Sequence, residues 1–241
     1  MNIVPLANKP FRISSLYHKQ ISLSAKFVQD EQGWMRVESF IDSTDEKNRT
    51  EESVSVADLS NLGKLDLKGH DLLKILKKNY LPARNIRVGT VVKPKSKDLR
   101  ETLCCILSDD EAMFLTNPSA LTKVTNHLTV DETSCFQVTD VSSVLACLYL
   151  IGPRSRDVIS KLTELNVNSE IFPNLTLTRV PIAHVQCFIL RVDLGELLGY
   201  QIYFERAYGE YLWDSVMHAG EEFRIGGIGL SAMKKLGWTW E

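Results

Sequence analysis

The 241-residue sequence predicts an α+β protein built from two internally duplicated, ferredoxin-like units, each a split βαβ arrangement with an antiparallel sheet. The first observation is a repeat. Val56–Leu76 and Val138–Leu162 both carry a valine, an aspartate and a serine, then alternating apolar residues, a glycine and a helical pattern. The second observation is that each copy continues in the same order, with two apolar strands around a polar turn and then a helix. Because the predicted elements follow one another in the same order in both copies, the sequence predicts two copies of one structural unit.

The repeat divides the chain into three parts. Residues 54–134 make the first ferredoxin-like repeat, residues 135–241 the second repeat with a tail, and residues 1–53 an N-terminal arm with leader strands. Prolines break regular structure early in the arm, and partly alternating apolar residues predict a strand over residues 15–28. The polar run 41–53 predicts a segment exposed to solvent, either a helix or a loop.

Local patterns predict the elements of the first repeat. Residues 71–78 place leucine and isoleucine toward a core and lysines outside, which predicts an amphipathic helix. Residues 103–107 and 112–116 are apolar runs around a polar turn and predict a hairpin. Asn117 stands directly before a proline, so it is predicted to cap a helix over residues 120–128.

The second repeat shows the same succession. A helix is expected to follow Gly152, and another to stop at Gly220. The stretch bracketed by Pro173 and Pro181 is rich in asparagine and threonine and is predicted to be a connection. The expected elements are a helix over 155–162, strands over 185–191 and 200–204, and a helix over 208–219.

Composition excludes several classes of function. The net charge of −2 does not indicate a basic surface of the kind that binds nucleic acid. Apolar runs long enough for a membrane span, about 18 residues, are absent from the sequence, and the N-terminus lacks the pattern of a signal peptide. The histidines and cysteines lack metal-ligand spacing, so no metal site is expected. Five cysteines are expected to be buried free thiols, which suits a reducing cytoplasm: Cys104, Cys105, Cys135, Cys147 and Cys187.

Five short motifs follow one another along nearly the whole chain. They are Leu16 and His18 with Ala25-Lys26-Phe27 before Gly33-Trp34; Asp58-Leu59-Ser60-Asn61-Leu62-Gly63-Lys64; Leu148-Tyr149-Leu150-Ile151-Gly152-Pro153; the hairpin Gly195–Tyr203; and Leu212–Gly220. Each motif is weak alone, but in this order they resemble the folate-binding family of the glycine cleavage system T-protein, an aminomethyltransferase. The resemblance implies an internally duplicated ferredoxin-like fold, which agrees with the repeat.

The resemblance also implies a site for tetrahydrofolate. It places four residues of this chain at ligand positions: Asn117, Asp193, Glu196 and Gln201. Two of them differ in type from the family, because Asp193 stands where the family has a tyrosine and Gln201 where a glutamate grips the pterin ring.

Two further family side chains are replaced. Val124 stands at the position of an aspartate that is thought to assist catalysis, and Met233 at that of an arginine. Valine cannot serve as a general acid or base, so no catalytic residue is assigned.

These replacements weaken the implied folate site. A carboxylate accepts two parallel hydrogen bonds from the N–H edge of a pterin, whereas Gln201 has a single acceptor oxygen. We therefore expect tetrahydrofolate to bind weakly or not at all. Two assignments have an alternative: Glu196 can be an exposed carboxylate in a turn, and Asn117 a helix cap.

The tail is the last informative stretch. Members of the family continue into a C-terminal β-barrel, which this chain is expected to lack. Apolar residues are dense near the end, and exposed apolar patches mark contact surfaces. We expect Leu236, Trp238 and Trp240 either to pack on the chain's own sheet or to seat a protein partner or a second copy, and we favour the second alternative.

Three classes of function remain open. The first is an aminomethyltransferase-like protein of folate-linked one-carbon metabolism with a degenerate site; if active, it would be a tetrahydrofolate-dependent aminomethyl- or methyltransferase. The second is a non-catalytic structural subunit of a complex that oxidises amines or methyl groups, because the small gamma subunit of heterotetrameric sarcosine oxidase is a shortened relative in the family. The third is a small-ligand-sensing module, a common use of paired ferredoxin-like units.

Overall fold

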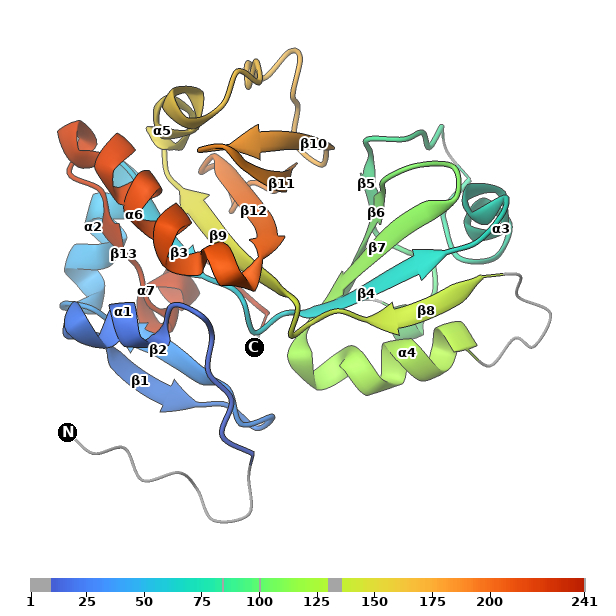
Figure 1. Cartoon of the computed structure of the whole chain (residues 1–241), viewed down its shortest axis with the longest axis horizontal. Coiled ribbons are helices and arrows are strands. Elements are labelled where there is room, and N and C mark those ends of the chain that lie inside the picture. The colour runs from blue at the N-terminus through green and yellow to red at the C-terminus, as the bar shows by residue number, and fades with distance from the viewer. Residues whose placement is uncertain (1–9, 84, 100, 130–135, 241) are drawn as a thin grey trace.

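The computed structural model describes residues 10–83, 85–99, 101–129 and 136–240. Two antiparallel sheets stand side by side, and a two-stranded hairpin lies near the N-terminus (Figure 1). In the described part, an edge of one sheet meets an edge of the other at a short antiparallel bridge between Thr90 and Thr176. The α+β class with antiparallel sheets, predicted from the repeat, is confirmed.

The five-stranded sheet has the order β5-β6-β7-β4-β8, and every neighbouring pair is antiparallel. The helices α3 (Leu72–Asn79) and α4 (Leu121–Thr129) accompany it, close to their predicted ranges. The predicted hairpin is present as β6 and β7. The strand bounds are β4 Gly63–Lys68, β5 Val91–Val92, β6 Thr102–Ile106, β7 Glu111–Thr116 and β8 Gln137–Asp140.

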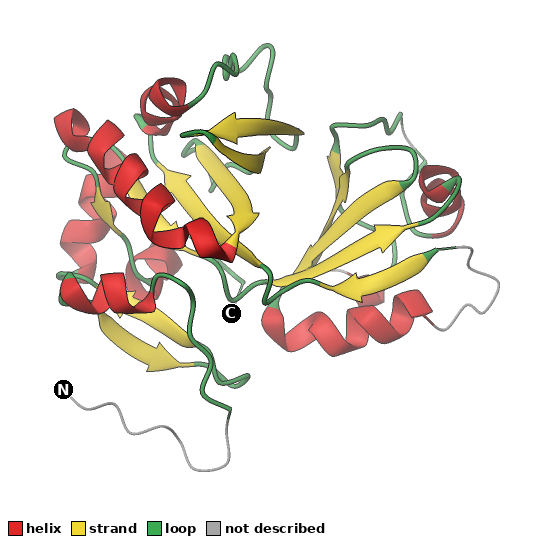
Figure 2. Cartoon of the chain, viewed as in Figure 1, coloured by secondary structure: helices red, strands yellow, loops and turns green. Residues whose placement is uncertain are grey.

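The six-stranded sheet has the order β10-β11-β12-β9-β3-β13. Its neighbours are antiparallel except for β13, which runs parallel to β3. Helices α5 (Ser155–Leu162) and α6 (Gly209–Ala219) lie on one side of it (Figure 2). The strand bounds are β3 Ser55–Asp58, β9 Leu145–Ile151, β10 Leu177–Ile182, β11 Val185–Arg191, β12 Gly199–Glu205 and β13 Gly226–Gly227.

The two sequence repeats exchange their first strands. Strand β3 opens the first repeat but pairs with β9 in the six-stranded sheet, whereas β8 opens the second repeat but pairs with β4 in the five-stranded sheet. The division at residues 134 and 135 therefore separates the repeats along the sequence, while each sheet contains residues from both. Because each repeat supplies a strand to the sheet of the other, the two sheets are tied together by backbone hydrogen bonds.

The repeated aspartate and serine form the turns at which the chain crosses between the sheets. In one copy the Asp58 carboxylate accepts a hydrogen bond from the Ser60 N–H, and in the other Asp140 accepts one from Ser142, each at 2.9 Å. An aspartate that binds the backbone two residues later mimics a backbone turn. The repeated motif is thus explained by two equivalent turns at the two crossings.

Lys64 holds the two crossing connections together. The backbone N–H of Lys64 donates to the Ser142 hydroxyl at 2.9 Å, and the equivalent N–H of Cys147 donates to the Ser60 hydroxyl at 3.1 Å. The fully buried Lys64 ammonium also donates to the carbonyl oxygens of Ser60 and Leu62, both at 2.9 Å, and of Ser142 at 3.3 Å. Burial lowers the pKa of this amine to about 8.

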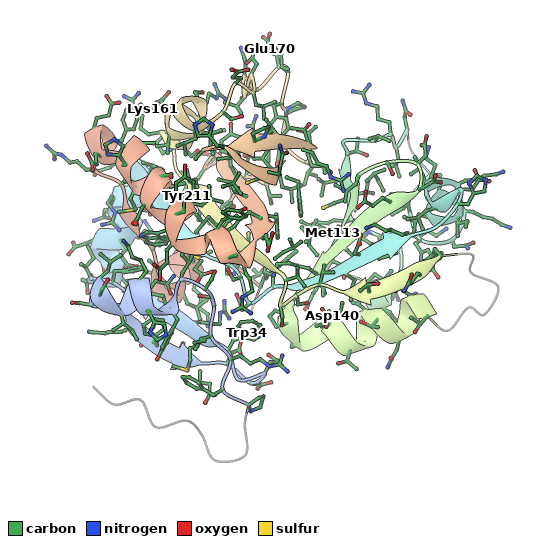
Figure 3. All side chains as sticks on the ribbon, in the orientation of Figure 1. Trp34, Met113, Asp140, Lys161, Glu170 and Tyr211 are labelled. Carbon is green, nitrogen blue, oxygen red and sulfur yellow. The ribbon has the colours of Figure 1, made fainter. Side chains whose placement is uncertain are left out.

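Three apolar clusters stabilise the layers. One lies between the five-stranded sheet and its helices α3 and α4, and a second between the six-stranded sheet and α5 and α6. The third contains residues of both sheets, such as Met113 of β7 and Tyr203 of β12. Figure 3 shows Met113 on the side of its sheet that faces the other sheet. We call this third cluster the intersheet core.

The leader differs from its prediction at one place. The strand expected over residues 15–28 is wrong in its first part, where helix α1 (Tyr17–Ser22) stands, and only β1 (Lys26–Gln29) is extended. Strand β1 pairs with β2 (Met35–Ser39). The prediction of a strand failed here because Leu16 and Gln20, four residues apart, lie on one face of a helix, and both are buried.

The polar run 41–53 is the helix α2 (Ser43–Glu52), one of its two predicted forms. Asp42 caps it by accepting from the Thr44 N–H at 2.7 Å. The expectation that the whole run is exposed is wrong at Glu46, which is fully buried. Its carboxylate accepts from the backbone N–H groups of Phe40 at 2.5 Å and of Gly229 at 2.8 Å, and so ties the leader to the tail.

Strand β10 was missed. The residues between Pro173 and Pro181, predicted to be a connection, contain most of β10, which pairs with β11 along Leu177–Ile182. Pro181 argued against a strand in the sequence, because proline has no N–H group to donate to a neighbouring strand. Strand β10 lies at the sheet edge, where one side of the strand needs no partner, so proline is tolerated there.

The tail folds back onto the chain itself. Helix α7 (Leu230–Lys235) is followed by Gly237, whose φ of +91° suits glycine, and the Trp238 N–H donates to the Met233 carbonyl at 3.0 Å. This turn directs the Trp238 ring against Tyr149 of β9, with ring centroids 5.7 Å apart, and only 8% of Trp238 is exposed. Trp238 thus belongs to the intersheet core, the first of the two alternatives drawn from the sequence.

Four of the five cysteines are free and buried, as predicted: Cys104, Cys105, Cys147 and Cys187. Cys135 lies outside the described residues. None of the described helices combines the length and the apolar content that a membrane crossing requires.

Candidate functional site

Three of the four residues implied as folate ligands come from one hairpin. Asp193 and Glu196 lie in the turn between β11 and β12, and Gln201 lies on β12. The fourth, Asn117, belongs to the other sheet, directly after β7. The structure therefore divides the four residues between the sheets.

Gln201 faces the intersheet core. It is 1% exposed, and its side chain lies on the same strand face as that of Tyr203, two residues later. The Tyr203 hydroxyl donates a hydrogen bond of 2.7 Å to the Gln201 Oε1 atom. The Gln201 Oε1 atom, which would accept a hydrogen bond from a ligand N–H, thus already accepts one within the protein.

Asp193 forms a nearly buried ion pair. Both carboxylate oxygens accept from the Arg191 guanidinium, at 3.1 and 3.0 Å, and one also accepts from the Gly199 N–H at 3.1 Å. Arg191 donates further to the Phe172 carbonyl at 3.0 Å. Bidentate pairs of this kind have fixed geometry. Asp193 therefore braces the turn between β11 and β12.

Glu196 lies at the exposed tip of the same turn. Leu194 and Leu197 close the turn with two backbone hydrogen bonds, of 2.9 and 3.0 Å. Gly195, with a φ of +62°, provides the left-handed backbone. The alternative interpretation of Glu196 as a turn carboxylate agrees with this position.

Asn117 caps the helical segment after β7. Its side-chain oxygen accepts from the Ser119 N–H at 3.2 Å, at the start of the short 3-10 helix η2 (Pro118–Ala120). Val124 follows on α4 and is fully buried between α4 and the outer face of its sheet. Val124 therefore lies in a different core from the one that Gln201 faces.

Sequence reasoning missed the polar groups that surround Gln201. Cys147 and Tyr149 of β9 belong to the intersheet core, as does Tyr203, and the Tyr149 hydroxyl donates to the Val192 carbonyl at 2.7 Å. The alternation along β9 and β12 was a signal that could have placed them on one face. Burial raises the pKa of both tyrosines and raises that of Cys147 to about 12.

Chemically, these groups of the intersheet core are neutral at physiological pH. They supply hydrogen-bond donors and acceptors in an apolar surrounding, and none of the named side chains is poised to take a proton. Met233, at the position of the family arginine, is 3% exposed in the same core and adds an apolar contact. In the described part of the chain, no three histidine, cysteine, aspartate or glutamate side chains gather as metal ligands would.

The family described as the GCVT N-terminal domain matches residues 16–238 of this chain. Sarcosine oxidase subunit alpha of Corynebacterium sp. (strain P-1) is 26% identical over 252 residues, which cover 94% of this chain and 26% of that protein. An aminomethyltransferase of Moorella thermoacetica is 24% identical over 230 residues, which cover 92% of this chain and 62% of that protein. The chain thus spans about a quarter of the first relative and less than two thirds of the second.

Two solved structures show the same fold. The glycine cleavage system aminomethyltransferase T from Bartonella henselae superposes with a TM-score of 0.77 at 17% identity, over 94% of this chain and 62% of that one. A chain of the heterotetrameric sarcosine oxidase from Corynebacterium sp. U-96 superposes with a TM-score of 0.60 at 20% identity. That match covers 88% of this chain and 96% of that one.

Proposed function

Because the chain belongs to the family of the GCVT N-terminal domain, we propose that it is an aminomethyltransferase-like protein of folate-linked one-carbon metabolism whose pterin site has degenerated. The observation that supports this proposal is the state of Gln201. It lies on the intersheet face without a carboxylate, and its oxygen accepts from Tyr203. A pterin edge with two N–H donors would find one acceptor there, already engaged.

The other implied ligands support the same proposal. The Asp193 carboxylate is engaged by Arg191, and Glu196 is an exposed turn residue. Opening the Asp193 pair would leave the Arg191 charge nearly buried without a partner, at a cost of about 3–5 kcal/mol. A ligand would have to offset that cost to recruit Asp193.

We expect tetrahydrofolate to bind this chain with a dissociation constant well above 10 μM, which corresponds to a binding free energy weaker than about −7 kcal/mol. Isothermal titration calorimetry under reducing conditions measures it. Gln201→Glu restores a carboxylate at that position and should strengthen binding by about tenfold, because hydrogen bonds to a charged acceptor are stronger.

Gln186→Glu is the matched control. Gln186 is exposed on β11, so the same change of charge there should leave binding as it was. Low-micromolar binding by the unaltered chain would show that the site is intact. An equal response of both variants would show that net charge, and not the position of Gln201, controls binding.

A second candidate is a non-catalytic subunit of a larger complex. It is favoured by the match to a chain of the heterotetrameric sarcosine oxidase, because that chain and this one are covered almost completely. We propose a protein partner or a second copy that contacts the tail at Leu236 and Trp240. Burial of Trp238 leaves the half-buried Leu236 and Trp240 as the available part of that surface.

Purification from the native source should then return this chain with a second polypeptide, or as a defined oligomer, in constant stoichiometry. Native mass spectrometry measures this. Trp240→Ala should weaken the assembly, whereas Tyr208→Ala, which removes an exposed aromatic residue elsewhere, should not. A monomer under native conditions would count against the subunit proposal. We also propose a cytoplasmic location, which the unpaired cysteines favour.

A further inference from the structure

Two equivalent strands of the duplicated fold are completed to different extents. Strands β3 and β8 carry the same motif, so Val56 of β3 corresponds to Val138 of β8, and Asp58 to Asp140. The outer edge of β3 is covered by the tail strand β13, which runs parallel to it. In the described part of the chain, the outer edge of β8 pairs with no strand and takes part in no isolated bridge. One copy of the edge is thus covered, and the other is open.

The open edge presents the same backbone groups as the covered one. In each copy, the residue after the aspartate donates its N–H inward, to β9 or to β4, at 2.9 Å. Because inward and outward groups alternate along a strand, Val56 and Val138 both turn their N–H and C=O groups to the outer edge. On β3 the Val56 carbonyl accepts from the Ile228 N–H at 3.0 Å, whereas the Val138 carbonyl has no such donor among the described residues.

The two aspartates also differ in their surroundings. The Asp58 Oδ2 atom accepts from the Ser14 hydroxyl at 2.6 Å and from the Gln20 amide at 3.1 Å, so the leader covers this carboxylate. Asp140 is exposed at the end of β8 (Figure 3), and within the described residues its carboxylate accepts only from the Ser142 N–H. A carboxylate beside an open strand edge favours a segment that brings a basic side chain, because charge-assisted hydrogen bonds are the stronger ones.

We propose that the outer edge of β8 binds an extended segment of a partner polypeptide. The segment pairs parallel to β8 as β13 pairs to β3, donates a backbone N–H to the Val138 carbonyl, and places a basic side chain beside Asp140. Backbone hydrogen bonds at a sheet edge provide affinity, and the side chains provide selectivity. A second copy of this chain has no equivalent segment to offer, because its own β13 and leader are bound to its own β3.

This surface differs from the ones considered above. It uses neither Gln201 and the intersheet core nor the tail residues Leu236 and Trp240. Its failure or success in an experiment is therefore independent of the folate proposal and of the proposed contact at the tail.

The probe is a synthetic peptide with the sequence of residues 224–231, which contains β13, with the substitution Gly229→Lys and with both ends blocked. The register of β13 on β3 brings residue 229 beside the aspartate of the motif, so on β8 the new lysine comes beside Asp140. On β3 the same lysine is excluded, because a Cβ atom at residue 229 would overlap with the Glu38 carbonyl oxygen. The peptide can therefore complete β8 but cannot replace β13.

We expect the peptide to bind the full chain saturably, with a dissociation constant of about 1 mM or tighter. Heteronuclear NMR shifts should concentrate on Val138–Asp140. The peptide without the lysine should bind about tenfold more weakly. Shifts at Ser55 and Val56 in place of β8 would show displacement of β13, and absence of saturable binding up to about 10 mM would likewise overturn the proposal.

Variants of the chain test the carboxylate. Asp140→Asn keeps an acceptor for the Ser142 N–H but removes the charge, so the tenfold advantage of the lysine peptide should disappear. Asp109→Asn is the matched control, because Asp109 is an exposed aspartate in the turn before β7 of the same sheet. Equal effects of the two variants would show a response to net charge alone and would refute the assigned position.

A proline on each side tests the backbone pairing. Val138→Pro removes the outward N–H of β8, and proline is tolerated in an edge strand where its position faces away from the sheet. Ile228→Pro in the peptide removes the N–H that should donate to the Val138 carbonyl. Each change should weaken binding by about tenfold or more, with the thermal transition of the chain intact. Unchanged binding in both cases would mean that the peptide does not pair with β8.

Discussion

Replacing Trp238 by alanine should lower the free energy of unfolding by about 3–5 kcal/mol, the usual cost of removing a buried tryptophan side chain. The ring is 8% exposed, contacts Tyr149 and lies among residues of the intersheet core. A loss of this size is a large fraction of a typical stability of about 5–15 kcal/mol. Urea unfolding followed by tryptophan fluorescence and by circular dichroism measures it.

Trp240→Ala is the control for this prediction. Trp240 is half-buried, and its backbone carbonyl, which accepts from the Trp238 indole N–H at 2.7 Å, survives the substitution. The expected loss is about 1 kcal/mol. If Trp238→Ala instead left stability unchanged and released a bound partner, the tail would be an interface and not part of the chain's own core.

The protein should lose several kcal/mol of stability between pH 9 and pH 10. Burial raises the pKa of the four described cysteines above the ordinary value of 9.0, to about 12 for Cys147 and Cys187. The unfolded chain therefore releases thiol protons in this interval while the folded chain keeps them. With more protons bound in the folded state, stability falls as pH rises.

Lys64 acts in the opposite direction. Its pKa is lowered from 10.5 to about 8, so between these values the unfolded chain binds the additional proton and stability rises with pH. One proton corresponds to about 1.4 kcal/mol per pH unit. Four thiols together remove about 4 kcal/mol between pH 9 and 10, and one lysine returns about 1 kcal/mol. Between pH 9 and 10 the stability lost through the thiols is therefore larger than the stability gained through Lys64. Between pH 8 and 9 the two contributions are nearly equal.

Urea unfolding at pH 8, 9 and 10 under reducing conditions tests the balance. A double variant, Cys105→Ala and Cys187→Ala, should lose about half of the thiol contribution to the pH dependence. Lys64→Met should steepen the decline, because the compensating group is gone. Constant stability from pH 9 to 10 would mean that the thiols are accessible to water in the folded chain.

The elements with local signals were predictable. Helix α5 and strand β11 have the predicted bounds, because proline or glycine punctuation and apolar periodicity act within a few residues. Failures occurred where a local signal was ambiguous. Pro181 concealed an edge strand, and Leu16 with Gln20 fits two periodicities over a short span.

The candidate site was predictable in part. Alternation along β12 places Gln201 and Tyr203 on one face, and the spacing of Arg191 and Asp193 on an extended strand allows an ion pair. That Asn117 stands on the other sheet, and that Val124 lies in another core, depends on contacts between segments far apart in the sequence. The open outer edge of β8 had no sequence signal, because β13, which covers the equivalent edge of β3, comes from a distant part of the chain.

By itself the sequence determined the α+β class, the duplication, and the hairpins and helices, because these follow from periodicity and turn chemistry within each segment. Only the tertiary structure decided which sheet each strand joins, since β3 and β8 carry the same motif and pair in opposite sheets. It also decided whether the tail faces water or the intersheet core. A residue pattern records that a side chain is apolar, but the surface that buries it is built by distant residues, and only folding brings them together.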